Sequence, residues 1–111
     1  MFTEKRRSPR FAFVAAAEIT DKELSGKLTT RVSELSGNGC YIDEQNPFPS
    51  GTIVTLKITA ASEVFEATAK VLYAHANLGM GLVFEEMSLR SGAVLREWLR
   101  AAKALEEKSH P

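Results

Sequence analysis

Arginine side chains gather just ahead of the first apolar run of the sequence. In "EKRRSPRFAF", residues 4–13, the cations are Lys5, Arg6, Arg7 and Arg10. The guanidinium group carries a planar fork of donors that suits phosphate oxygens and the O6 and N7 acceptors of guanine. Arg6 and Arg10 are four residues apart, so they can grip one ligand from two sides. The alternative is a basic arm that is only solvated.

A second group of residues with ligand-binding chemistry lies in the turn "ELSGNG", residues 34–39. The carboxylate of Glu34 and the hydroxyl of Ser36 complement guanine, whose N1 and N2 are donors. Gly39 lets the backbone approach a ligand closely, because it has no side chain. The arm and the turn together favour a guanine nucleotide. Each alone is better explained as a solvated arm or an ordinary turn of an all-β domain.

Other kinds of site find little support in the residues. His75 and His110 are far apart in the sequence and lack a ligand partner at useful spacing, and Cys40 stands alone, so we expect no metal. The sequence contains neither a G-x-S-x-G elbow nor a Walker-type loop. We therefore predict a protein that is not an enzyme, with no catalytic residues and no cofactor.

Charge and composition narrow the class of protein further. Fourteen basic residues balance fourteen acidic ones, which argues against general nucleic-acid binding. A single cysteine excludes an internal disulfide, and no apolar stretch is long enough to span a bilayer. The N-terminus also lacks the apolar run of a signal peptide. These features predict a cytoplasmic protein without membrane insertion.

The chain divides into an arm, a β domain and a helix. Residues 1–10 are polar and basic and are expected to form a flexible arm. Residues 11–87 contain about six short strands of alternating polarity, which predicts an all-β barrel or sandwich. In "VFEATAKVLY" the alternation puts Tyr73 on the same face as Phe65, inside the β domain.

Residues 88–106 have apolar side chains at helical spacing, including Leu95, Trp98 and Leu99. Ser88, or alternatively Ser91, is a plausible N-cap. The Trp98 stripe is expected to pack on the β domain and close one end of it. A partner-binding surface is the less favoured alternative.

The two motifs, taken in order, resemble those of the PilZ domain family. That family carries R-x-x-x-R in an N-terminal arm, seen here as "RRSPR", and then [D/N]-x-S-x-x-G, seen here as "ELSGNG". The stretch "GMGLVFEEMS", residues 79–88, also resembles the last core strand of the family and its exit. The resemblance covers nearly the whole chain.

The resemblance implies a six-stranded antiparallel β-barrel with a C-terminal helix, and binding of the bacterial second messenger cyclic di-GMP. Arg6 and Arg10 would grip the ligand, with Arg7 as an auxiliary cation. Ser36 and Gly39 would lie against a guanine. Tyr73 would be a candidate for aromatic stacking on a base, although a residue of the barrel is the favoured interpretation. The chain departs from the family pattern at Glu34, where the usual residue is Asp or Asn, and glutamate adds one methylene and a rotor.

Three hypotheses of function follow. The first is a non-enzymatic cyclic di-GMP receptor that relays the signal to an unknown partner protein. The second is an interaction module of the same fold that has lost ligand binding, which the departure at Glu34 keeps open. The third is a small RNA- or DNA-binding barrel; only Lys57, Lys70 and Tyr73 hint at it, and the zero net charge argues against it.

Overall fold

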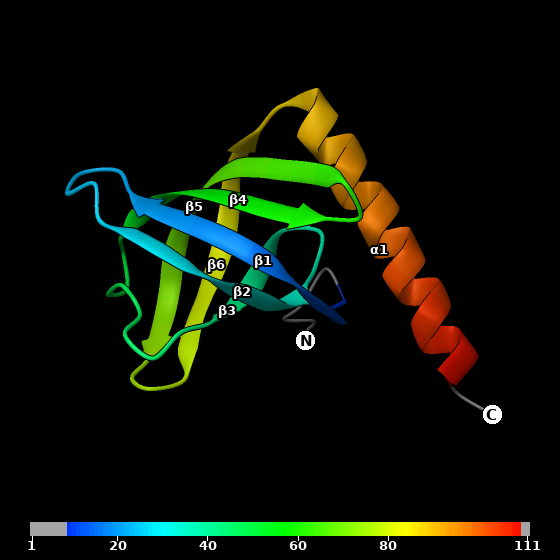
Figure 1. The fold of residues 1–111 in the computed structure, drawn as a ribbon, viewed down its shortest axis with the longest axis horizontal. Helices are drawn as coiled ribbons and strands as arrows, with labels where there is room; N and C mark the ends of the chain where they lie inside the picture. The colour runs from blue at the N-terminus through cyan, green and yellow to red at the C-terminus, as the bar shows by residue number, and fades with distance from the viewer. Residues whose placement is uncertain (1–8, 110–111) are drawn as a thin grey trace, which may run out of the picture.

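A computed structural model describes residues 9–109 and shows a closed antiparallel β-barrel with one helix (Figure 1). The strand order around the barrel is β1-β2-β3-β6-β5-β4. This confirms the six-stranded barrel with a C-terminal helix. The elements are β1 (Phe11–Asp21), β2 (Lys27–Leu35), β3 (Gly39–Asp43), β4 (Ile53–Ala60), β5 (Glu63–His75), β6 (Gly79–Met87) and α1 (Leu89–Ser109).

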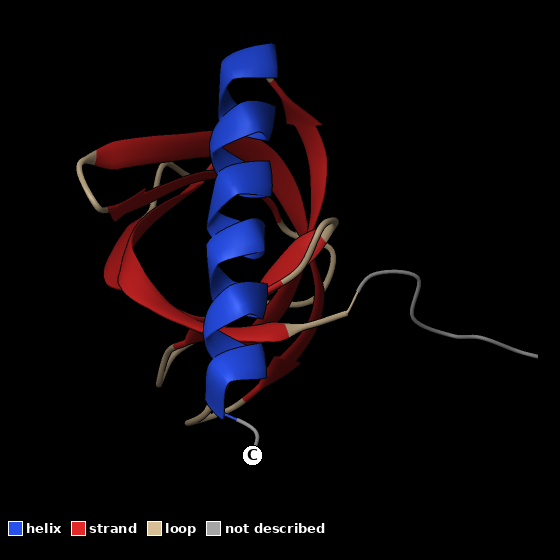
Figure 2. Ribbon diagram, turned by 90° about the vertical axis from the view of Figure 1, so that its right-hand side faces the viewer, coloured by secondary structure: helices blue, strands red, loops and turns tan. Residues whose placement is uncertain are grey.

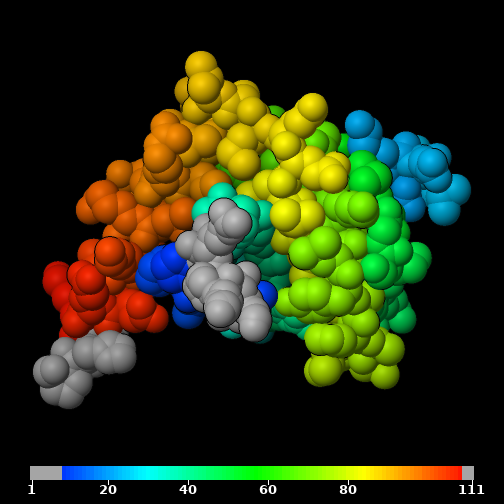
Figure 3. Space-filling model, turned by 180° about the vertical axis from the view of Figure 1, so that it is seen from behind, coloured from blue at the N-terminus to red at the C-terminus, as the bar shows by residue number. Residues whose placement is uncertain are grey.

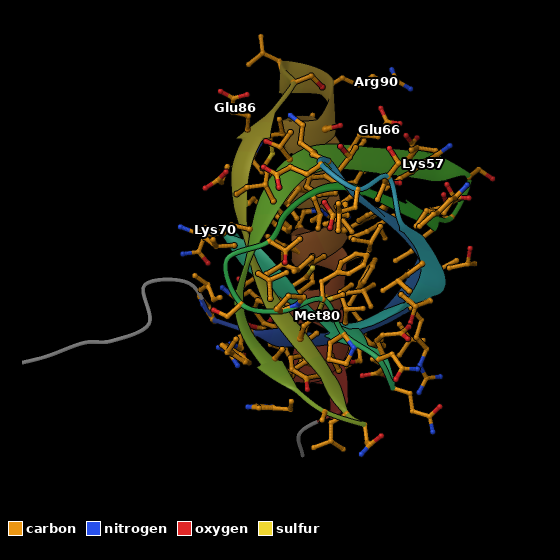
Figure 4. All side chains as sticks on the ribbon, turned by 90° about the vertical axis from the view of Figure 1, so that its left-hand side faces the viewer. Lys57, Glu66, Lys70, Met80, Glu86 and Arg90 are labelled. Atoms are coloured by element: carbon orange, nitrogen blue, oxygen red, sulfur yellow. The ribbon has the colours of Figure 1, made fainter. Side chains whose placement is uncertain are left out.

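The strands form because their side chains alternate between the barrel interior and its surface. In β4, for example, Val54, Leu56 and Ile58 are fully buried, whereas the residues between them are exposed. Figure 4 shows Met80 among the interior side chains and the charged side chains of Lys57 and Glu66 at the periphery. The interior is therefore filled by apolar side chains, and a ligand site has to lie outside it.

Several register shifts interrupt the pairing of the strands, and two of these β-bulges, in β2 and β5, determine which side chains face the candidate site. In β2, Ser33 is an extra residue, because Val32 pairs with Ile42 but Glu34 pairs with Tyr41. In β5, Leu72 is an extra residue, because Val71 pairs with Leu82 but Tyr73 pairs with Gly81. An extra residue reverses the face on which the next side chains lie.

The bulge at Leu72 corrects the expectation for Tyr73. Gly81 faces outward, because its neighbours Met80 and Leu82 are buried in the core, and the ring of Tyr73 lies against Gly81. Tyr73 is therefore on the outer surface and not inside the barrel with Phe65. Strict alternation along β5 is broken one residue before Tyr73, and that break is the reason for the error.

Hydrogen bonds from serine hydroxyls satisfy polar groups at both bulges. The Ser33 hydroxyl donates to a carboxylate oxygen of Asp43 at 2.9 Å. The Ser50 hydroxyl donates to the backbone carbonyl of Leu72, also at 2.9 Å. The bulges are thus supported by specific contacts from a neighbouring strand and a loop.

Helix α1 packs against β1 and β5 through Trp98. The Trp98 ring lies 5.1 Å from that of Phe13 and 6.4 Å from that of Phe65, between centroids. At the start of the helix the Ser91 amide donates to the Ser88 hydroxyl at 3.0 Å, which confirms Ser88 as the N-cap. Figure 2 shows α1 crossing in front of the barrel. No helix within residues 9–109 is long and apolar enough to cross a membrane.

Gly39 is required by strand pairing itself. A Cβ built at Gly39 would lie 2.2 Å from the backbone carbonyl oxygen of Leu82 on β6. That distance is far shorter than any van der Waals contact, and a backbone atom in a sheet cannot easily move aside. Gly39 therefore allows β3 and β6 to pair, whether or not a ligand binds nearby.

We predict that Gly39→Ala destabilises the protein by about 1–3 kcal/mol, because β3 must shift away from β6. Urea unfolding of the variant and the wild type measures this change. Gly26→Ala is the matched control, since a Cβ at Gly26 would meet its nearest neighbour, an atom of Phe48, only at 4.0 Å. Equal unfolding free energies for the wild type and Gly39→Ala would show that this close approach is not real.

Candidate functional site

A hollow of about 400 Å³ lies in the barrel surface where the residue before β1, the β2–β3 turn, the last part of β5 and the middle of β6 meet. Figure 3 shows these segments side by side on one face of the molecule, in blue, teal and yellow to green. The residues that line the hollow are Arg10, Glu34, Leu35, Ser36, Asn38, Gly39, Cys40, Tyr41, Leu72, Tyr73, Gly81, Leu82 and Val83. All four sequence-predicted site residues within the described chain, Arg10, Glu34, Ser36 and Gly39, are among them.

Arg10 and Glu34 bring the two sequence motifs together. A guanidinium nitrogen of Arg10 lies 3.7 Å from a carboxylate oxygen of Glu34. The pairing of β1 with β2 sets this proximity, since Ala12 lies opposite Glu34 in the ladder. Both side chains are nearly half exposed, at 42% and 49%, so the ion pair is worth little and a ligand can replace it at small cost.

Ser36 organises the turn in this structure. Its backbone N–H donates to the Gly39 carbonyl at 2.9 Å, and its hydroxyl lies within hydrogen-bonding distance of the Asn38 side-chain oxygen and the Gly39 carbonyl, at 3.1 and 3.2 Å. Ser36 is buried, whereas Asn38 is exposed. The buried hydroxyl therefore holds the turn, and the exposed amide of Asn38 offers polar groups to the hollow.

The apolar side of the hollow contains two tyrosines. The rings of Tyr41 and Tyr73 lie 6.3 Å apart between centroids and are tilted by 33°. Burial is the largest cause that raises the pKa of Tyr41 above its ordinary value of 10.0, and the neighbouring Tyr73 and nearby carboxylates add to it. The Tyr41 hydroxyl is therefore neutral at physiological pH.

Sequence reasoning missed Tyr41, and for Tyr73 it favoured a residue of the barrel over the alternative of a ring that stacks on a ligand base; the structure places Tyr73 at the hollow. The sequence "GMG" in β6 was the available signal for these aromatic side chains. Its two glycines are separated by one residue and so lie on the same face of the strand, where they leave room for large neighbours. Both tyrosines occupy that room, because a Cβ at Gly81 would lie 2.3 Å from the Tyr73 ring and a Cβ at Gly79 would lie 2.7 Å from the Tyr41 ring.

Cys40 lies at the base of the hollow as a buried hydrophobe. Burial raises the pKa of its thiol far above the ordinary range, so the sulfur remains protonated and is a poor nucleophile or metal ligand. Within residues 9–109 no three His, Cys, Asp or Glu side chains are placed to hold a metal ion. His75 instead contacts the Tyr73 ring, at 5.2 Å between centroids.

Arg6 and Arg7 lie outside the described residues, and so does His110. The roles of the two arginines therefore stay predictions. Arg10, which comes three residues after Arg7 in the chain, lies at the hollow.

The solved structures with a similar fold include two PilZ domains. The PilZ domain of YcgR from Escherichia coli, solved with c-di-GMP, has a TM-score of 0.73 at 14% identity, covering 97% of this chain and 100% of that one. The PilZ domain of CeSA from a cellulose-synthesizing bacterium has a TM-score of 0.65 at 18% identity, covering 89% and 99%.

The Bacillus subtilis inhibitor of motility, MotI/DgrA, has a TM-score of 0.71 at 21% identity over 88% of this chain. This chain spans about half the length of MotI, at 51%. At these identities the similarity shows the fold alone. A comparison with curated protein sequences found no match.

Sequence comparison identifies the family directly. The model of the PilZ domain matches residues 4–101, which include the arginine arm, the whole barrel and the first half of α1. This match agrees with the closed six-stranded barrel and its C-terminal helix. The chain therefore belongs to the PilZ domain family.

Proposed function

We propose that this protein is a non-enzymatic receptor for cyclic di-GMP that acts in the bacterial cytoplasm. The observation that carries the proposal is the position of Arg10, 3.7 Å from Glu34, in a hollow that the turn of residues 34–39 also lines. The arginine of one motif and the acceptor of the other thus face the same space.

The chemistry of the hollow fits a dianion that carries two guanines. Arg10 offers paired donors to a phosphate or to O6 and N7 of guanine. Glu34 offers a charged acceptor for N1 and N2 of guanine. No charge other than those of Arg10 and Glu34 lines the hollow within residues 9–109, so specific contacts rather than a broad basic field would select the ligand.

Arg6 and Arg7 would bind the ligand from the side opposite the barrel. Arg10 lines the hollow, and Pro9 restricts the backbone just before it. Ordering of the arm on the ligand would create a new surface of arm, ligand and barrel. We propose that an unidentified partner protein reads this surface.

The structural relatives support both halves of the proposal. The PilZ domain of YcgR was solved with c-di-GMP, and MotI is named as an inhibitor of motility. The ligand would thus be shared with the PilZ domain of YcgR, and a regulatory role would be shared with MotI.

A second candidate function is an interaction module of the same fold that binds no cyclic di-GMP. The observation that favours it is Glu34, which is longer than the usual Asp or Asn and already pairs with Arg10. If this pair persists, both groups are occupied and the hollow serves as an ordinary protein surface.

We predict that Arg10→Ala weakens cyclic di-GMP binding roughly tenfold to a hundredfold, because one bidentate arginine contact with guanine is worth about 1–3 kcal/mol. Isothermal titration calorimetry measures this, with GTP as the control ligand. Arg10→Lys should restore only part of the affinity, since lysine keeps the charge and loses the planar fork. Thermal stability should hardly change, because the pair with Glu34 is exposed.

Arg90→Ala is the matched charge control, because Arg90 is exposed at the start of α1 and does not line the hollow. Undiminished binding by Arg10→Ala would remove Arg10 from the site. Full restoration by Arg10→Lys would reduce its role to nonspecific electrostatics. Absence of binding by the wild type would favour the interaction module.

We predict that Glu34→Gln weakens binding by about 1 kcal/mol, or roughly fivefold, because a neutral acceptor replaces a charged one. Glu34→Asp, which restores a residue usual in the family, should retain or increase the affinity. The same titration measures both variants, with thermal unfolding to show that they are folded. If neither change alters the affinity, Glu34 does not contact the ligand.

A further inference from the structure

Helix α1 continues beyond the part of it that packs on the barrel. Its apolar stripe consists of Leu95, Trp98, Ala102 and Leu105, whose spacings of three and four residues keep them on one face. Leu95 and Trp98 are buried, Ala102 is partly covered and the Leu105 side chain is 69% exposed. Figure 1 shows the last turns of the helix extending past the strands. The stripe therefore serves the barrel core in the first half of α1 and is exposed in the second half.

The charges of α1 are poorly arranged for a helix that stands alone. Acidic side chains stabilise the N-terminal end of a helix dipole and basic ones stabilise the C-terminal end. The first turn of α1 contains Arg90 and no acidic residue, whereas Glu106 and Glu107 lie near its end, beside the favourable Lys108. Neither glutamate forms an ion pair with another residue of the described chain. The exposed half of α1 thus combines an apolar stripe with unpaired carboxylates.

Charged side chains flank the stripe on both sides. Lys103 and Glu106 are three residues apart and lie on one flank. Glu97 and Lys108 lie on the other flank, since they come four residues before Ala101 and seven residues after it. Each flank therefore carries one charge of each sign, with the two signs at different heights along the helix.

A second copy of α1 matches this pattern when the two helices are antiparallel. With Leu105 of each copy packed on Ala102 of the other, Glu106 lies within about 3 Å, measured along the axis, of Lys103 of the other copy. Lys108 and Glu97 approach each other equally closely on the opposite flank. A twofold axis repeats each contact, so two pairs of opposite charges form on each side of the stripe.

A parallel pair of helices lacks this complementarity. Its two helix dipoles would point the same way, and each charge would lie at the height of the same charge in the other copy. In the antiparallel pair the dipoles are opposed, and the small side chains of Ala101 and Ala102 allow the two backbones to approach. The exposed half of α1 is thus complementary to itself, which favours a second copy over an unrelated partner.

We propose that the protein forms an antiparallel homodimer through the second half of α1. Leu105 of each copy packs on Ala102 of the other, and Glu106 pairs with Lys103 across the interface. The contact is short, so the dimer is weak and forms at high protein concentration. The dimer does not depend on ligand binding, because no residue of α1 within the described chain lines the hollow.

The first test measures the molar mass of the full chain by sedimentation equilibrium over a concentration series. The wild type should approach the mass of a dimer as its concentration rises. Leu105→Ala should raise the Kd of the dimer roughly tenfold or more, because the symmetric interface loses two leucine side chains. Leu89→Ala is the matched control and should leave the Kd unchanged, since Leu89 is 94% exposed on the same helix and lies outside the stripe.

The second test separates contacts between copies from contacts within one helix. Lys103→Glu and Glu106→Lys each place like charges opposite one another in the dimer, so each variant alone should raise the Kd roughly fivefold to thirtyfold. An equimolar mixture of the two variants should dimerise like the wild type, because each copy then meets the opposite charges in the other. Charges that act only within one helix would not be restored by mixing.

Three results would overturn the homodimer, and none of them affects the receptor proposal. The first is a monomer mass for the wild type at about 1 mM, where a complex with a Kd of that size is substantially formed. The second is a dimer whose Kd neither Leu105→Ala nor the charge reversals change, which would place the interface elsewhere. The third is a monomer in which Leu105→Ala shifts the NMR signals of residues 1–8, which would assign the stripe to the arm of the same chain.

Discussion

The strict alternation of side chains in a closed sheet is the constraint on which the candidate site depends. Every inward position of the barrel is needed for the core, where residues such as Ile42, Leu56 and Phe65 are fully buried. Functional side chains must therefore face outward. Strand pairing decides which residues do so. One extra residue in a strand is the smallest change that reverses the face.

The barrel uses this change twice around one hollow. The bulge at Ser33 turns Glu34 outward beside Arg10, and the bulge at Leu72 turns Tyr73 outward over Gly81. A serine hydroxyl supports each bulge: Ser33 donates to the Asp43 carboxylate, and Ser50 donates to the backbone carbonyl of Leu72. The polar and the aromatic side of the hollow thus have the same structural origin.

Much of the fold was predictable from the sequence because it follows from local patterns. Alternating polarity predicted the strands, helical spacing predicted α1, and the cap at Ser88 marked its start. Arg10 and Glu34 were expected at one site through the resemblance to PilZ domains, and the structure brings them to one hollow, while their contact with a ligand stays a prediction. The two bulges were not predictable from the sequence. Nothing in "RVSEL" or "KVLYA" distinguishes an extra residue from regular alternation. The contacts that support the bulges come from Asp43 and Ser50, which are distant from them in the sequence. That is why Tyr73 was placed on the wrong face, and why the role of Gly39 in pairing β3 with β6 appears only in three dimensions.

The central claim is that a guanine dinucleotide binds in the hollow between the turn of residues 34–39 and the tyrosines. An NMR titration of ¹⁵N-labelled protein with cyclic di-GMP tests this most directly, because every backbone amide reports its own surroundings. The account predicts saturable shifts for amides of Arg10, Glu34, Asn38, Tyr41 and Tyr73, with little change at Leu24 in the β1–β2 turn or at Lys103 on the exposed part of α1. Shifts that centre away from the hollow, or no shifts at saturating ligand, would contradict it.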